Sequence, residues 1–277
     1  MSSRINLQSA YILHSRPYRD TSVILDVFTL NHGRIGLLAR GARSARSRLR
    51  GVLQPFRCLL VSWSGRSELR TLGKAEENGV PLWLTGQALV IGFYLNELVL
   101  RLLHRDDPHP GIFACYESTL NGLGKAAFDV SDEDARKMHY ERVTRIFEKE
   151  LLRELGYGLI LDHDVKNGAP VEPDTRYSFE LSRGPVLDSR QPPDSNTGKR
   201  LIIHGASLLS LETNDLTDAR SLREAKTLLR AALALYLDGR PLNSRTLLPT
   251  VKRTPARSAA SDDEIPEIGI VVQRFVV

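Results

Sequence analysis

Residues 22–28 read Ser-Val-Ile-Leu-Asp-Val-Phe, and this run predicts the architecture of the first part of the chain. Successive side chains of a β-strand point to opposite faces, so Val23, Leu25 and Val27 share one face and Asp26 lies on the other. Asn31, His32 and Gly33 follow as a turn signal. We therefore expect a strand here that buries its apolar face.

Similar short apolar runs recur about every dozen residues up to residue 77. They cover residues 10–14, 34–39, 56–63 and 68–73. Turn signals separate them at Arg16-Pro17-Tyr18, Gly41, Gln54-Pro55 and Ser64-Gly65. Five short strands in so few residues fit a small closed barrel such as an OB fold. Such barrels bind single-stranded nucleic acid along an open face and its loops.

The hydrophobic period changes to that of helices from about residue 81. Residues 82–103 are apolar nearly all round, which is typical of a helix inside a bundle, and residues 111–123 predict another. Ser131-Asp132-Glu133-Asp134 predicts an N-cap for a helix that stops at Gly156. After a predicted hairpin of residues 177–182 and 184–188, helices resume at 206–211 and 218–237.

These elements predict an α+β protein with three parts. Residues 1–80 form an N-terminal OB-fold β-barrel, and residues 81–253 form an α-helical domain with a loop-rich β insertion at about 157–200. Residues 254–277 are expected to be a disordered tail, because proline, alanine, serine and acidic residues dominate up to residue 266. The apolar run 268–277 predicts either an added strand or an exposed apolar end, and the sequence does not distinguish between them.

Arginine is concentrated between residues 34 and 50, where the chain holds six arginines and no acidic residue. The planar guanidinium can donate two parallel hydrogen bonds to one phosphate. Residues 1–80 carry 13 Lys+Arg against 5 Asp+Glu, whereas the remainder carries 25 against 28. We therefore predict contact between the first domain and nucleic acid, with a solvated basic loop as the alternative. The candidate residues are Arg34, Arg40, Arg43, Arg46, Arg48, Arg50, Arg66, Arg70 and Lys74.

Aromatic side chains in the same domain have two interpretations. Tyr11, Phe28, Phe56 and Trp63 could stack on bases, but an aromatic residue in a barrel strand more often belongs to the core. Tyr18, between Arg16 and Arg19 in a predicted turn, is the best candidate for an exposed ring.

Composition excludes several classes of protein. The chain has 277 residues, 42% of them hydrophobic, and a formal net charge of +5, as in a globular protein. The two cysteines, Cys58 and Cys115, predict no disulfide framework and fit a reducing cytoplasm. No signal peptide is visible, and residues 88–103 are too few and too polar for a membrane span.

No catalytic constellation is present in the sequence. There is no phosphate-binding loop of the Walker type, no dinucleotide fingerprint and no histidine or cysteine spacing typical of a metal site. Asp162-His163-Asp164 is interpreted as a polar loop. We expect no enzyme, cofactor or metal. Two alternatives stay open, namely an RNA-binding or ribosome-associated OB module and an enzyme that holds an anionic substrate at the arginines.

A set of ordered motifs resembles the bacterial recombination mediator family RecO. They are Tyr11–Tyr18 (YILHSRPY), Ser22–Thr29 (SVILDVFT), Gly33-Arg34, Ala39–Ser44 (ARGARS), Leu53–Phe56 (LQPF), Tyr94–Leu98 (YLNEL), Leu155–Gly158 (LGYG) and Tyr236–Arg245 (YLDGRPLNSR). The resemblance covers about residues 8 to 250. It implies an OB fold, a helical body and a zinc-ribbon-like insertion. Here that insertion has no cysteine after residue 158, so we expect no structural zinc.

The resemblance also implies a function and partners. Members of the family take part in DNA repair in the cytoplasm, on the nucleoid. They bind single- and double-stranded DNA, anneal complementary strands, associate with RecR and bind the C-terminal tail of single-strand-binding protein, so that RecA can replace that protein. They need no ATP hydrolysis of their own.

The acidic, apolar tail of single-strand-binding protein requires an apolar groove with cations along its rim. The predicted helix from Asp132 to Leu155 offers Arg142, Arg145 and Lys149 beside Ile146. A solvated basic face over a core stripe is the alternative interpretation of these residues.

Overall fold

The computed structural model describes residues 4–188, 201–237 and 240–244. It divides into two compact units, one formed by residues 1–124 with 241–277 and the other by residues 125–240. The expectations for the tail 254–277 and for a strand at 268–277 lie outside the described residues. The predicted domain boundaries are not tested by these units and stay predictions.

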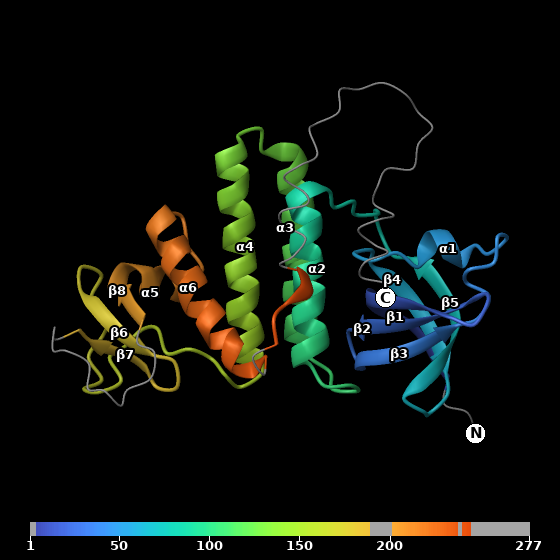
Figure 1. The fold of residues 1–277 in the computed structure, drawn as a ribbon, viewed down its shortest axis with the longest axis horizontal. Helices are drawn as coiled ribbons and strands as arrows, with labels where there is room; N and C mark the ends of the chain where they lie inside the picture. Colours follow the sequence, from blue (N-terminus) through green and yellow to red (C-terminus); the bar gives the residue numbers. More distant parts are fainter. Residues whose placement is uncertain (1–3, 189–200, 238–239, 245–277) are drawn as a thin grey trace. The chain divides into compact units, whose positions relative to one another are not determined.

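The first unit contains a closed β-barrel, drawn in blue in Figure 1. Its strands are β1 (Arg4–Tyr18), β2 (Ser22–Thr29), β3 (Gly33–Ala39), β4 (Leu59–Ser64) and β5 (Leu69–Glu77). They follow the order β1-β2-β3-β5-β4, with β3 and β5 parallel and the other pairs antiparallel. Leu25, Val27, Ile35, Leu37 and Val61 belong to the apolar core inside. The five predicted strands and the OB-like barrel are therefore confirmed.

Several strand boundaries differ from the sequence prediction: β1 extends beyond residues 10–14 at both ends, β4 begins later than residue 56, and β5 continues past residue 73 to Glu77. Pro17 belongs to β1 instead of a turn, because β1 pairs with β4 only between Arg4 and Ala10 and so has a single neighbour at Pro17. Proline is tolerated where a strand is unpaired on one side. Strand β4 begins at Leu59 instead of Phe56, because Phe56 has a φ of +65° and turns toward Phe93.

Two helices belong largely to the same unit, α2 (Gly86–Leu102) and α3 (Pro110–Asp129), and Figure 1 shows them next to each other. Aromatic rings connect α3 to the barrel, because the ring centroids of Tyr11 and Phe28 lie 5.1–6.1 Å from those of Phe113 and Tyr116. Tyr11, Phe28, Phe56 and Trp63 are all buried, so these four aromatics are core residues.

Asn96 of α2 is a buried polar link between the barrel and α3. Strand β1 has an irregular register between Ile12 and His14, which takes Leu13 out of the ladder with β2. The amide nitrogen of Asn96 donates to the Leu13 carbonyl at 2.8 Å, and its oxygen accepts from the Tyr116 hydroxyl at 2.5 Å. One side chain therefore satisfies two polar groups that would otherwise lie in an apolar core.

Glu97, the next residue of α2, holds the returning chain. Its carboxylate accepts the backbone N–H groups of Asn243 and Ser244 at 2.9 Å each, and the Ser244 hydroxyl at 2.8 Å. Arg101 also forms an ion pair with the Glu97 carboxylate at 2.6 Å. Glu97 of the motif 94–98 thus binds Asn243 and Ser244, which lie near the end of the motif 236–245.

The second unit combines helices with a small sheet. It contains α4 (Glu133–Glu154), α5 (Gly205–Glu212) and α6 (Ala219–Tyr236), together with β6 (Arg176–Glu180), β7 (Gly184–Leu187) and β8 (Leu201–His204). The sheet has the order β7-β6-β8. Asp132 caps α4 as predicted, and Gly156 follows the helix with a φ of +81° that favours glycine. The predicted hairpin is β6 and β7, whereas β8 was not predicted, although its sequence Leu-Ile-Ile-His is an apolar β-branched run.

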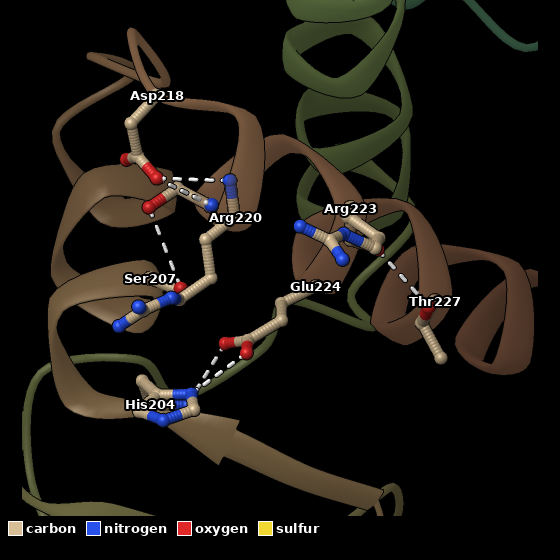
Figure 2. A network of polar contacts seen from close by, with 8 residues as sticks. His204, Ser207, Asp218, Arg220, Arg223, Glu224 and Thr227 are labelled. Carbon is tan, nitrogen blue, oxygen red and sulfur yellow. Dashed lines mark hydrogen bonds and ion pairs between the residues drawn. The ribbon is translucent and has the colours of Figure 1, made fainter.

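Glu224 joins the small sheet to α6, as Figure 2 shows. Its carboxylate accepts the His204 backbone N–H at 2.9 Å and meets the imidazole Nδ1 at 2.7 Å. Burial alone would raise the pKa of Glu224, but the hydrogen bonds from His204 and Ser207 outweigh burial and lower it. Asp218 caps α6 through the backbone N–H groups of Arg220 and Ser221.

In the part of the chain that the structure describes, no helix has both the length and the apolar character that crossing a membrane requires.

Replacing Asn96 with alanine should destabilise the protein, because both of its hydrogen bonds lie in the core. We expect the free energy of unfolding to fall by about 2–3 kcal/mol, measured by urea denaturation. Asn121 is exposed on α3, and Asn121→Ala should change stability by no more than about 0.5 kcal/mol. Equal effects of the two substitutions would contradict the linking role of Asn96.

Candidate nucleic-acid interface

The segment from Arg40 to Arg50 leaves the barrel after β3 and is held on its surface. Ala42 is buried, and Leu49, Val52 and Leu53 pack against the barrel core. The backbone N–H of Arg43 donates to the Thr21 carbonyl at 2.7 Å. A short helix, α1 (Leu49–Val52), follows. The apolar residues of this stretch therefore face inward, and its arginines are left on the outside.

Five arginines of this stretch are exposed, and we call them the arginine segment: Arg40, Arg43, Arg46, Arg48 and Arg50. No acidic residue occurs between Asp26 and Glu68 in the sequence. Among the ion pairs that join described residues, none involves these five guanidinium groups. Their positive charge is therefore available to a polyanion.

Arg34, the remaining arginine of residues 34–50, has a different role. Its Nη1 donates to the Leu100 carbonyl at 2.7 Å, and its own carbonyl accepts from the Asp106 backbone. Burial lowers the pKa of the Arg34 guanidinium, and the neighbouring Arg105 lowers it further. Arg34 was predicted to contact DNA, and this stays a prediction; in the structure its side chain connects β3 to α2.

The other predicted cations of the barrel do not join the arginine segment in one uniform surface. Arg70 forms an ion pair with Asp106 at 2.6 Å, and Lys74 forms one with Glu76 at 2.6 Å. Arg66 is exposed in the turn between β4 and β5. Arg70 is half-buried and already neutralised, so it is a weaker candidate than Arg66 for phosphate contact.

Arg57 and Trp83 lie beside the arginine segment and were not among its predicted members. The Arg57 guanidinium carbon lies 4.4 Å from the centroid of the Trp83 ring, and Nη1 donates to the Gly51 carbonyl at 3.0 Å. Arg57 also pairs with Glu77. Trp83 has no signal in the sequence pattern, because it stands in the link between the barrel and α2, where no periodicity marks it.

Tyr18, the predicted exposed aromatic, is half-buried, and the Arg19 guanidinium carbon lies 5.3 Å from its ring centroid. The carbonyl of Arg19 accepts from Arg43 at 3.4 Å. Tyr18 therefore lies near the beginning of the arginine segment.

The thiols offer no chemistry of their own. Cys58 and Cys115 are both half-buried and form no disulfide. Burial raises the pKa of the Cys58 thiol, which keeps it protonated and poorly nucleophilic.

The cations predicted to surround a partner groove are used inside the second unit. Arg145 is 6% exposed and pairs with Glu148 at 2.9 Å. Lys149, 9% exposed, donates to the carbonyls of Leu211 and Glu212, and burial lowers its pKa. Arg142 donates to the Asn214 carbonyl at 3.1 Å. The prediction that these residues form an exposed rim is wrong. Lys149 binds backbone carbonyls at the end of α5, and Arg142 binds a carbonyl just after it. Ile146, on the same helix, is half-buried.

The loop at Asp162-His163-Asp164 is organised by hydrogen bonds. Asp164 is buried, and its carboxylate accepts the backbone N–H groups of Lys166 and Leu187 at 2.7 Å each. His163 pairs with Asp162 at 2.7 Å. Within residues 4–188, 201–237 and 240–244, no group of three His, Cys, Asp or Glu side chains could hold a metal ion. Asp164 therefore fastens this loop to β7.

Family models and related proteins match most of the length of this chain. The family described as Recombination protein O N terminal matches residues 1–78, and Recombination protein O C terminal matches residues 84–246. A protein of Nitrosospira multiformis is 44% identical over 245 residues, which cover 88% of this chain and 95% of the relative. One from Coxiella burnetii is 44% identical over 248 residues, with coverage of 90% and 100%. Another from Alkalilimnicola ehrlichii is 44% identical over 262 residues, with coverage of 94% and 98%. All three are named DNA repair protein RecO.

Replacing Arg145 with alanine should leave the fully buried carboxylate of Glu148 without its cation. We expect the free energy of unfolding to fall by about 3–5 kcal/mol in a denaturant titration. Lys137 is exposed on the same helix and is the matched control, with an expected change of about 0.5 kcal/mol or less. A small effect at both positions would instead place Arg145 on the surface.

Proposed function

The chain belongs to the RecO family and has a role in DNA repair, and from this premise we propose that it is a recombination mediator. In this role it binds single- and double-stranded DNA and anneals complementary strands. It acts in the cytoplasm, on the nucleoid, and catalyses no chemical step.

The arginine segment is the observation that supports this proposal most strongly. Its five guanidinium groups are exposed and project from a single backbone stretch on the barrel. Each can bind one phosphate through two parallel hydrogen bonds. Phosphate contacts fix a strand without reading its bases, so binding should show little sequence preference.

Annealing follows from the same contacts. Two DNA strands repel each other through their phosphates, and a protein that neutralises those phosphates lowers the repulsion. The bases remain available, because the arginines hold the backbone. Base pairing then supplies the free energy of the reaction, and no hydrolysis of a nucleotide is needed.

The proposed function also includes protein partners. We propose that the chain associates with RecR, binds the C-terminal tail of single-strand-binding protein and so helps load RecA. Because Arg142, Arg145 and Lys149 bind inside the second unit, the tail requires another surface. Tyr157 and Leu235 are exposed apolar side chains of that unit and are the positions to substitute first.

The salt dependence of DNA affinity tests the proposal directly. If the five arginines of the segment each neutralise one phosphate of a duplex, the logarithm of the association constant should fall with the logarithm of the salt concentration with a slope of about −4 to −5. Replacing Arg43, Arg46, Arg48 and Arg50 together with alanine should leave a slope of about −1. Fluorescence anisotropy of a labelled duplex measures both slopes.

A matched variant removes four exposed arginines from the second unit, namely Arg176, Arg220, Arg223 and Arg230. It lowers the net charge equally and should keep the wild-type slope. An unchanged slope in the first variant would refute contact between the segment and DNA. If RNA of the same sequence displaced the DNA at a lower concentration than unlabelled DNA, an RNA-binding module would be favoured instead.

A further inference from the structure

Trp83 is a large aromatic side chain that the proposed DNA contacts do not yet use. It lies in the link between β5 and α2 and is 58% exposed. The other tryptophan, Trp63, is 3% exposed in the barrel core. Singly exposed apolar side chains are common on protein surfaces, so a ligand for this ring is inferred from what surrounds it.

Arg57 fixes the position of this ring. Its guanidinium lies over the indole with 4.4 Å between the guanidinium carbon and the ring centroid. The same guanidinium donates to the Gly51 carbonyl at 3.0 Å and pairs with Glu77, so three neighbours hold it in place. The side chain of Arg57 is only 11% exposed. Trp83 therefore rests on a fixed cation.

The ring also lies next to the arginine segment. Gly51, whose carbonyl binds Arg57, directly follows Arg50, the last member of the segment. The Arg50 carbonyl is itself held by the Gln54 side chain at 2.8 Å. The path from Trp83 through Arg57 to Gly51 thus connects an exposed aromatic ring to a row of phosphate-binding side chains.

We propose that Trp83 is a stacking platform for an unpaired base of a DNA strand whose phosphates lie on the arginine segment. This inference rests on the proposed function and deepens it. Every base has a π-face, so stacking on an aromatic side chain adds affinity without sequence preference. In a duplex the bases are already stacked on one another, so only single strands use the platform. The arginine segment then serves both forms of DNA, and Trp83 favours single strands.

Charge argues for a nucleic acid rather than an apolar peptide as the occupant. Val80, in the same link, is 94% exposed, so an apolar patch alone would also fit a protein partner. The charge of Arg57 is balanced by Glu77, but the arginine segment, which ends at Arg50 next to Gly51, supplies exposed cations close to the ring. A ligand with a planar apolar group and an anionic backbone matches this pairing.

Tryptophan fluorescence tests the platform, because Trp63 is buried and Trp83 is exposed. Titration of the full chain with oligothymidylate should quench the emission through stacking on Trp83. An oligomer of the same length and charge that consists of abasic sites should bind without this quench, and so should a duplex. The Trp83→Phe variant should lose the quench.

Affinity measured by anisotropy provides the second readout. Trp83→Ala should weaken oligothymidylate binding on the order of tenfold and change duplex binding less than twofold. Val80→Ala is the control in the same link and should change neither. Unchanged duplex affinity also shows that the variant is folded.

Three results would overturn the platform. They are an equal quench by the abasic oligomer, no quench while oligothymidylate binds normally, and equal weakening of single-strand and duplex binding in Trp83→Ala. The last would mean that Trp83 only supports Arg57 and the arginine segment beside it. Absence of binding to any DNA by the wild-type chain would refute the proposed function itself, so the two failures are distinguishable.

Discussion

The adjacent side chains of Asn96 and Glu97 on α2 form the polar contacts on which the first unit depends. Asn96 satisfies a carbonyl that a strand irregularity releases from β1, and Glu97 binds the two backbone N–H groups where the chain returns at residues 243 and 244. Both side chains are buried, so the loss of one of these hydrogen bonds would leave a polar group unpaired in the core and would lower the stability of the fold. The barrel that carries the arginine segment is thereby connected to α2, α3 and a segment about 150 residues further along the chain.

Neighbouring groups decide what each arginine does in this protein. Arg34 and Arg145 lie among carbonyls or buried carboxylates and hold elements together. The arginine segment has no acidic residue nearby in the sequence, and Ala42 and Leu49 between its members pack against the barrel core. The same side chain is therefore a structural link in one place and a free cation in another. The charges close to an arginine therefore indicate its role better than the net charge of the chain does.

Much of the fold could be predicted from the sequence, because strand alternation, helix caps and turn residues are local signals. The barrel strands and the cap at Asp132 follow from such signals. Side-chain direction on a helix is less predictable, because Lys149 is buried against the carbonyls of α5 and Arg145 is buried beside Glu148, and no local pattern indicates either contact. The exposure of the arginine segment could be predicted from its unopposed charge. Trp83 could not be predicted, because its cation–π contact with Arg57 exists only in the folded barrel.

An annealing assay tests whether the arginine segment brings complementary DNA strands together. Two complementary oligonucleotides are coated with the cognate single-strand-binding protein and mixed with the protein in the absence of ATP. The account predicts that the wild-type chain and the variant lacking Arg176, Arg220, Arg223 and Arg230 accelerate duplex formation, whereas the variant lacking Arg43, Arg46, Arg48 and Arg50 does not. Equal acceleration by all three proteins would contradict it.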